Sequence, residues 1–176
     1  ENETVPVPLG LYSHSDQIQQ WQTSVPDRAV GLGWGGRSAD LLAALNQNQE
    51  ISMNISLGGS NVWQSGQQVV EYAISNDGSI GLDGYEGTWN YNHVRGAAID
   101  SQLDLEYRNL FEKTFAQKSR GSIDAHYHFM EAINAAPVFN TTFPANSWLG
   151  DNLRMVARTI AAHQLLGVRR QTFFVS

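Results

Sequence analysis

Short stretches of alternating or purely apolar residues predict three strands. Apolar and polar positions alternate over residues 50–57, as in a half-buried strand. The run 69–74 predicts a second short strand that ends at the turn residues Asn76, Asp77 and Gly78, and 171–175 is apolar enough for a buried strand. These strands are far apart in the sequence, so other elements must connect them.

Helical spacing of apolar residues accounts for most of the remaining chain. The expected helices cover residues 13–24, 37–45, 92–118, 122–134 and a last segment that begins at 146 or 147 and ends before Gly167. In the last of these the residues predicted to face inward are Leu149, Leu153, Val156, Ala157 and Ile160.

The segment 92–134 predicts a helical hairpin. Its first helix carries an apolar stripe, Leu103, Tyr107, Leu110, Phe111 and Phe115, at helical spacing. Arg120 and Gly121 are expected to break the helix, after which Ser122 caps a second one.

Helices that alternate with short strands indicate an α/β protein, rich in helix, with the helical hairpin inserted between strands. The length of 176 residues and the 41% of hydrophobic residues suit one domain, or an internal fragment of a larger one, over 1–176. Residues 1–9 read as an extended arm because of their alternate prolines, and 76–145 as a loop followed by the helical hairpin.

Charge and composition exclude several functions. The net charge of −6 disfavours binding to nucleic acid or to an anionic membrane surface. With no cysteine there can be neither a disulfide nor a thiolate metal site. No apolar run is long enough to span a membrane.

The densest group of reactive side chains is Ser13-His14-Ser15-Asp16 at the start of the first predicted helix. One interpretation is structural: Ser13 or Ser15 caps the helix, and Asp16 interacts with the helix dipole. The other is chemical, because a hydroxyl at a helix amino end can act as a nucleophile beside free N–H groups that bind an anion.

Three blocks of sequence resemble the bacterial family called "domain of unknown function 1501". They are Ser13-His14 with Trp21, Gly33-Trp-Gly-Gly-Arg37, and residues 152–162 followed by 173–176. That family is placed in the alkaline phosphatase and sulfatase-like superfamily. The resemblance therefore implies an alkaline phosphatase-like α/β fold and a hydrolase of phosphate or sulfate esters.

The resemblance also implies roles for individual residues. Ser13 occupies the nucleophile region with His14 beside it as the second catalytic residue, and Asp16 and Arg37 are expected to contact the substrate. Asn61, in the Gly-Gly-Ser-Asn loop after the strand 50–57, is the third expected substrate contact, although such a loop is just as commonly a plain turn.

Two glycine-rich blocks that carry metal ligands in this family are missing from the sequence. The chain thus resembles an internal portion of a longer protein, inactive alone, with no metal ligands of its own. The complete chain is expected to bind a divalent metal (zinc, manganese or calcium). Its expected partners are the remainder of its own fold or a partner chain, together with an anionic ester or carbohydrate ligand, and the family places it in the periplasm or outside the cell.

Two other functions stay open. The chain can be a noncatalytic binding or assembly module, including a carbohydrate-binding one, because tryptophan, tyrosine and amide side chains are frequent. A metal-free serine hydrolase would combine Ser13 with His93, His126 or His163.

Two further patterns are weak. Gly31, Gly33 and Gly36 fit G-x-G-x-x-G, but the strand that precedes a dinucleotide loop is missing. His126 and His128 point about 200° apart on a helix, so they cannot chelate one ion there.

Overall fold

The chain is a mixed α/β structure, seen in a computed structural model that describes residues 8, 10–46, 50–87 and 89–176. Apart from Pro8, the predicted arm at 1–9 lies outside the described residues. In chain order the helices, 3-10 helices (η) and strands are α1 (His14–Thr23), α2 (Trp34–Leu42), η1 (Ala43–Leu45), β1 (Asn54–Ser56), β2 (Tyr72–Ser75), β3 (Gly78–Ser79), η2 (Trp89–Tyr91), α3 (Asn92–Leu103), α4 (Leu110–Ala135), α5 (Trp148–Ala161) and β4 (Thr172–Phe174).

The four strands form one sheet in the order β3-β2-β1-β4. Strand β1 is parallel to both neighbours, and Ile55 lies opposite Tyr72 on one side and Phe173 on the other. β1 and β4 lie within predicted stretches, and β2 overlaps the predicted stretch 69–74 and ends one residue beyond it. The two residues of β3 are an addition, because the turn at Asn76 and Asp77 folds the chain back antiparallel to β2.

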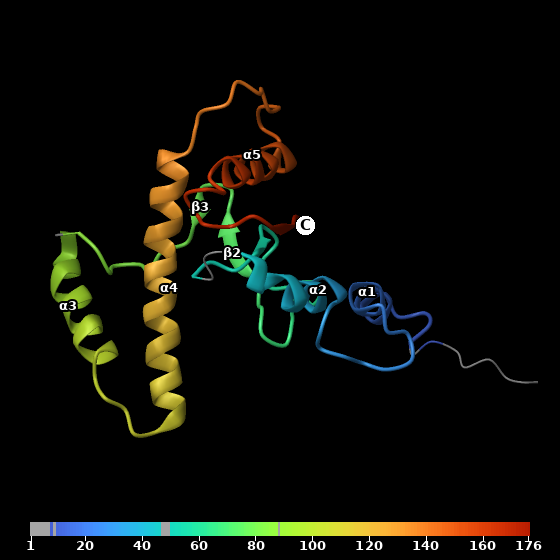
Figure 1. The fold of residues 1–176 in the computed structure, drawn as a ribbon, viewed down its shortest axis with the longest axis horizontal. Helices are drawn as coiled ribbons and strands as arrows, with labels where there is room; N and C mark the ends of the chain where they lie inside the picture. Colours follow the sequence, from blue (N-terminus) through green and yellow to red (C-terminus); the bar gives the residue numbers. More distant parts are fainter. Residues whose placement is uncertain (1–7, 9, 47–49, 88) are drawn as a thin grey trace, which may run out of the picture.

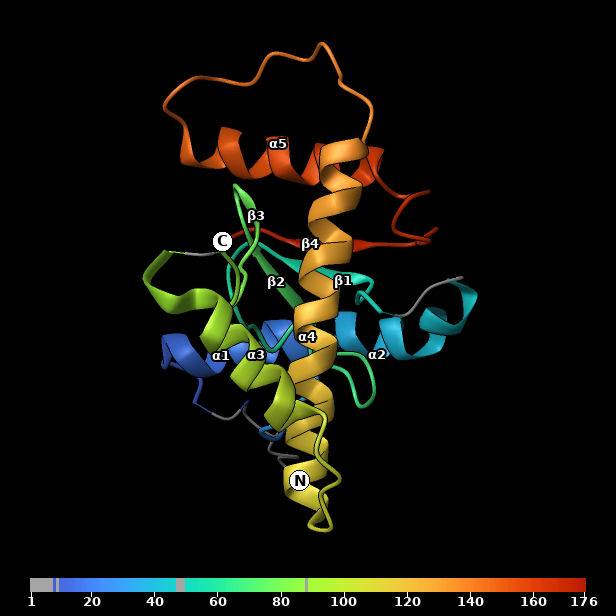
Figure 2. The ribbon, with the colours of Figure 1, turned by 90° about the vertical axis from the view of Figure 1, so that its left-hand side faces the viewer.

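Helix α4 covers one face of the sheet (Figures 1 and 2). Phe129 is fully buried there, and its ring lies 5.7 Å from that of Tyr72 on β2. Ile55 from β1 and Met155 from α5 belong to the same hydrophobic cluster. The core therefore lies between α4, α5 and the apolar face of the sheet.

The helical hairpin exists, but the predicted position of its turn is wrong. Helix α4 runs through Arg120 and Gly121 without a break for 26 residues. The chain reverses instead over 104–109, where the Asn109 side chain caps α4, so α3 and α4 form the antiparallel pair of Figure 1. A single glycine costs a helix only about 1 kcal/mol, which the packing of buried residues on the next turns, such as Ala116 and Ile123, can offset.

The apolar stripe predicted for this hairpin is divided between the two helices and the turn. Leu103 ends α3, and Leu110 begins α4. Leu110, Phe111 and Phe115 are largely exposed. Their spacing satisfies the helical pattern, but this end of α4 extends beyond the sheet (Figure 2).

The predicted orientation of α5 is also wrong. Its most apolar side faces outward, where Leu149, Leu153 and Ile160 are 49%, 43% and 51% exposed. The side that faces the core is made of smaller and partly polar residues: Gly150, Asn152, Met155 and Thr159. Hydrophobic periodicity identified the helix correctly, but it does not identify which of two sides meets the sheet.

Candidate functional site

Ser13 caps α1, as the structural interpretation of the sequence predicts. Its Oγ accepts a hydrogen bond from the backbone N–H of Asp16 at 3.4 Å and lies 3.0 Å from the hydroxyl of Ser15. The neighbouring His14 is exposed, and Asp16 lies against the backbone of Gly10. Ser13, His14 and Asp16 are thus together at the amino end of one helix, with the Ser13 hydroxyl half-buried.

Arg37 is placed at the other end of α1. Its guanidinium donates to the carbonyl of Thr23, the last residue of α1, and to that of Leu32, both at 2.8 Å. These bonds join the end of α1 to the loop before α2. Arg37 therefore has a structural role at the end of α1, away from Ser13, His14 and Asp16 at its start.

The glycine cluster lets the loop 62–66 pack closely on the start of α2. The N–H groups of Gly33 and Gly36 donate to the carbonyls of Ser65 and Trp63, both at 2.9 Å. A methyl group at Gly33 or Gly36 would come within 2.1 Å of the backbone of the 62–66 loop. The G-x-G-x-x-G spacing is explained by this close approach, which occupies the start of α2 without any nucleotide.

A network of buried polar side chains lies on the face of β1 opposite Ile55. We call Asn54, Ser56, Asn61, Gln64 and Thr172 the strand-end cluster. Thr172 on β4 donates to Asn54 on β1 at 2.7 Å, and Asn54 donates to the backbone of Gln64 at 2.9 Å. Gln64 is fully buried and donates to the carbonyl of Ile55 and to Thr172.

Asn61 belongs to the strand-end cluster and closes the loop after β1. Its amide donates to Gln64 Oε1 at 3.0 Å and to Ser56 Oγ at 3.3 Å, while its Oδ1 accepts from the Gln64 backbone at 2.8 Å. Asn61 is partly buried, and both its amide nitrogen and its amide oxygen are engaged in these bonds. The sequence identified Asn61 through its loop, but it gave no signal for Gln64.

The carboxyl ends of β1 and β4 meet beside the strand-end cluster. A methyl group at Gly58 would lie 2.2 Å from Ser176 Oγ, so the two chain segments leave the sheet in contact. The indole of Trp63 packs between Trp34 and Phe174, and its buried Nε1 has no hydrogen-bond partner among the described residues. This edge is where open α/β sheets generally bind ligands.

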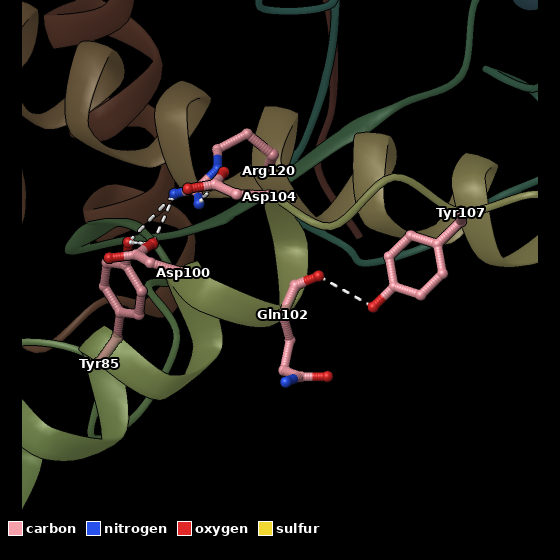
Figure 3. Close-up of polar contacts among 6 residues, drawn as sticks. All are labelled: Tyr85, Asp100, Gln102, Asp104, Tyr107 and Arg120. Atoms are coloured by element: carbon pink, nitrogen blue, oxygen red, sulfur yellow. Dashed lines mark hydrogen bonds and ion pairs between the residues drawn. The ribbon is translucent and has the colours of Figure 1, made fainter.

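A second polar group holds α3 against α4 (Figure 3). Asp100 accepts hydrogen bonds from Tyr85 and Arg120, both at 2.6 Å, and Arg120 also pairs with Asp104 at 3.1 Å. The bonds from Tyr85 and then Arg120 lower the pKa of Asp100, and the bond to Asp100 raises the pKa of Tyr85. Tyr107 bonds only to a backbone carbonyl, that of Gln102, at 2.9 Å.

The histidines have separate partners. His126 Nδ1 lies 3.1 Å from Ser79 Oγ, which in turn is 2.6 Å from the hydroxyl of Tyr72. His128 Nδ1 lies 3.3 Å from Glu50, and its buried Nε2 meets no hydrogen-bond partner in the part of the chain that the structure describes. In the part of the chain that the structure describes, no three His, Asp, Glu or Cys side chains are grouped as metal ligands.

Comparison with known protein families, curated proteins and solved structures finds no match to this chain. None of the described helices is long and apolar enough to cross a membrane. Any functional assignment therefore depends on the residues and the geometry described above.

Proposed function

We propose that the chain is the sheet-bearing part of a hydrolase of phosphate or sulfate esters and is inactive alone. The observation that carries this proposal is the half-buried hydroxyl of Ser13, which lies at the amino end of the ten-residue helix α1 next to His14. Free N–H groups at such an end stabilise negative charge on a bound ester and on its transition state. The sequence resemblance assigns the nucleophile to this same residue.

The finer fold expected from the resemblance, alkaline phosphatase-like, belongs to this proposal. Supporting it are the parallel strands β2, β1 and β4 and the meeting of the β1 and β4 carboxyl ends. Asn61, a partly buried residue of the strand-end cluster at that edge, is kept in this proposal as a substrate contact. Arg37 is not assigned to the ester, since both of its bonds hold backbone carbonyls.

The side chains described here do not supply the metal site that the resemblance implies, because they contain no group of three metal-binding residues. In this proposal the metal ligands belong to polypeptide outside this chain. Within the chain, Ser13 Oγ would bond to the phosphorus or sulfur atom as the bond from that atom to the ester oxygen breaks, and the alcohol would leave with the Ser13 proton. Water would then hydrolyse the seryl ester, with the α1 amino end holding the oxygens of the transferred group.

The test uses this chain and a version extended at both ends, assayed on 4-nitrophenyl phosphate, its diester and 4-nitrophenyl sulfate with zinc, manganese or calcium. We expect turnover only from the extended protein, with loss of at least about 100-fold in Ser13→Ala. Ser15→Ala is the matched control, because it removes the neighbouring hydroxyl and should keep most of the activity. Equal turnover in both variants, or none in the extended protein, would exclude the proposal.

The alternative is a noncatalytic assembly module, which a different observation favours. The outward side of α5 carries Trp148, Leu149, Leu153 and Ile160, all substantially exposed. Strand β4 is the outer strand of the sheet in the described part of the chain, so its outer backbone groups can pair with another strand. No turnover by any of the proteins tested, combined with association through α5 and β4, would support this function.

A further inference from the structure

A cavity of about 450 Å³ lies between α3, α4 and the segment that follows β3. Figure 1 shows this segment passing beside both helices before α3 begins. Ile99 and Leu103 line the cavity from α3, Ile123 from α4, and Ile80 and Leu82 from the segment. The volume falls in the range of small-molecule sites, and its apolar walls would bury the body of an organic ligand.

Two tyrosine rings give this cavity its chemical character. Tyr85 and Tyr127 both line it, and their ring centroids are 6.4 Å apart. The Tyr85 hydroxyl donates to Asp100 at 2.6 Å, and Glu86 is near enough to Tyr127 to raise the pKa of its hydroxyl. The bond to Asp100 holds the Tyr85 ring in place, and the His126 ring packs 5.1 Å from the Tyr127 ring. Aromatic rings that line a cavity can bind a cation through their faces.

The charges around these rings are mainly negative. Glu86, Asp100 and Asp104 contribute three carboxylates around these rings, and two guanidinium groups oppose them, that of Arg120 and that of Arg95 beside Gly84. Burial, followed by the Glu86 bond and the negative charges of Glu86 and Asp100, raises the pKa of Tyr127 to about 12. The potential at this wall therefore disfavours an anion and favours a cation.

Three polar side chains besides the tyrosines line the cavity, Ser119, Ser122 and His126, and Ser122 and His126 are already engaged, Ser122 with the Lys118 carbonyl. His126 lines its wall, but its Nδ1 is at hydrogen-bond distance from Ser79 and its Nε2 packs against Gly81. These contacts leave the tyrosine faces as the main recognition element. Apolar walls, aromatic faces and surrounding carboxylates together suit one class of small molecule.

We propose that this cavity binds a hydrophobic organic cation, such as an aryl or alkyl ammonium compound, with its charge against the faces of Tyr85 and Tyr127. The apolar body of the ligand lies along Ile99, Leu103 and Ile123. This site is separate from Ser13 and from the strand-end cluster, so it does not depend on the proposed ester hydrolysis.

The test measures binding of benzyltrimethylammonium, its neutral isostere neopentylbenzene and the anion benzenesulfonate by saturation-transfer NMR. We expect the cation to bind at least about threefold more tightly than the isostere, as cation–π contacts of this kind do, and the anion to bind most weakly. Glu86→Gln should weaken binding of the cation and leave the isostere unchanged. Equal binding of all three probes, or no binding of the cation, would overturn the proposal.

Cavity-filling variants locate the site. Ser119→Trp places a large ring in the cavity from α4 and should abolish binding, while Gln117→Trp, on the same helix but outside the cavity lining, should not. Circular dichroism shows whether Ser119→Trp folds. If it does not, Leu82→Trp replaces it, because Leu82 is half-exposed and lines the opposite wall of the cavity. Full binding in a folded, cavity-filled variant would place the ligand elsewhere and contradict the proposal.

Discussion

Single polar side chains in this protein hold together segments that are far apart in the sequence. Buried Asn46 accepts from the backbone N–H groups of Arg169 and Arg170 and donates to the Arg170 carbonyl. Asp40 on α2 accepts from three successive N–H groups, of Gln67, Gln68 and Val69, at 2.7 to 3.0 Å. Such residues resemble functional ones in a sequence, because their backbone partners leave no sequence signal.

The carboxylate of Asp40 should make stability depend on pH. Burial alone would raise its pKa, but the three backbone bonds outweigh burial and lower it. A carboxyl group with a lowered pKa in the folded state stabilises the protein fully above the unfolded pKa of about 4, and this contribution is lost as the pH falls through the folded pKa. We expect Asp40→Asn to lower the free energy of unfolding by about 1 to 3 kcal/mol at pH 7.

Urea denaturation at pH 7 and near pH 3 checks this prediction. The gap between the two proteins should shrink at the lower pH, where the native carboxyl begins to take up a proton. Ser38→Ala is a suitable control, because Ser38 is an exposed residue on the same helix whose hydroxyl bonds only locally, to the Trp34 carbonyl. A gap that is constant across this pH range would show that the Asp40 charge does not contribute.

At the scale of elements, periodicity predicted which stretches fold but not how they end or which side they bury. Ile55 is buried as the alternating pattern over 50–57 predicts, but the polar positions Asn54 and Ser56 are buried as well, so the strand is not half-buried. Each described α-helix overlaps a predicted helix, whereas η2 was not predicted. The break at Gly121 was wrong because tertiary packing offsets a small local cost. The orientation of α5 was wrong because its outward side is the more apolar one, and periodicity records only the contrast between sides.

Two glycines in helices should respond in opposite ways to alanine. Gly121 in α4 is exposed, and a methyl group there would meet nothing within 4 Å, so Gly121→Ala should stabilise the protein by up to about 1 kcal/mol. Gly36 in α2 packs on the backbone of Ser65 and Gly66, so Gly36→Ala should cost at least about 2 kcal/mol. Thermal unfolding of the two variants compares them directly. A stabilising Gly36→Ala would mean that the 62–66 loop does not dock on α2.

At the scale of the whole molecule, the candidate site could be predicted only in pieces. The sequence grouped Ser13, His14 and Asp16 because they are neighbours, and the structure keeps them at one helix end. Arg37 could not be placed from the sequence, since its partners are carbonyls of Thr23 and Leu32. The strand-end cluster joins residues more than 100 positions apart, and only the parallel pairing of β1 with β4 creates it.

The two sides of α5 should separate folding from association. Met155 is 1% exposed in the core, so Met155→Ala should cost about 2 to 5 kcal/mol in the free energy of unfolding. Leu153→Glu and Ile160→Glu alter the outward side, so each should change that free energy by less than about 0.5 kcal/mol. An apolar face of this kind binds another surface when one is present, so the glutamates should reduce association measured by sedimentation velocity. A glutamate variant that unfolds as readily as Met155→Ala would instead mean that Leu153 and Ile160 are buried in the folded protein. The sheet would then have to contact the side of α5 that the sequence pattern predicts to face inward.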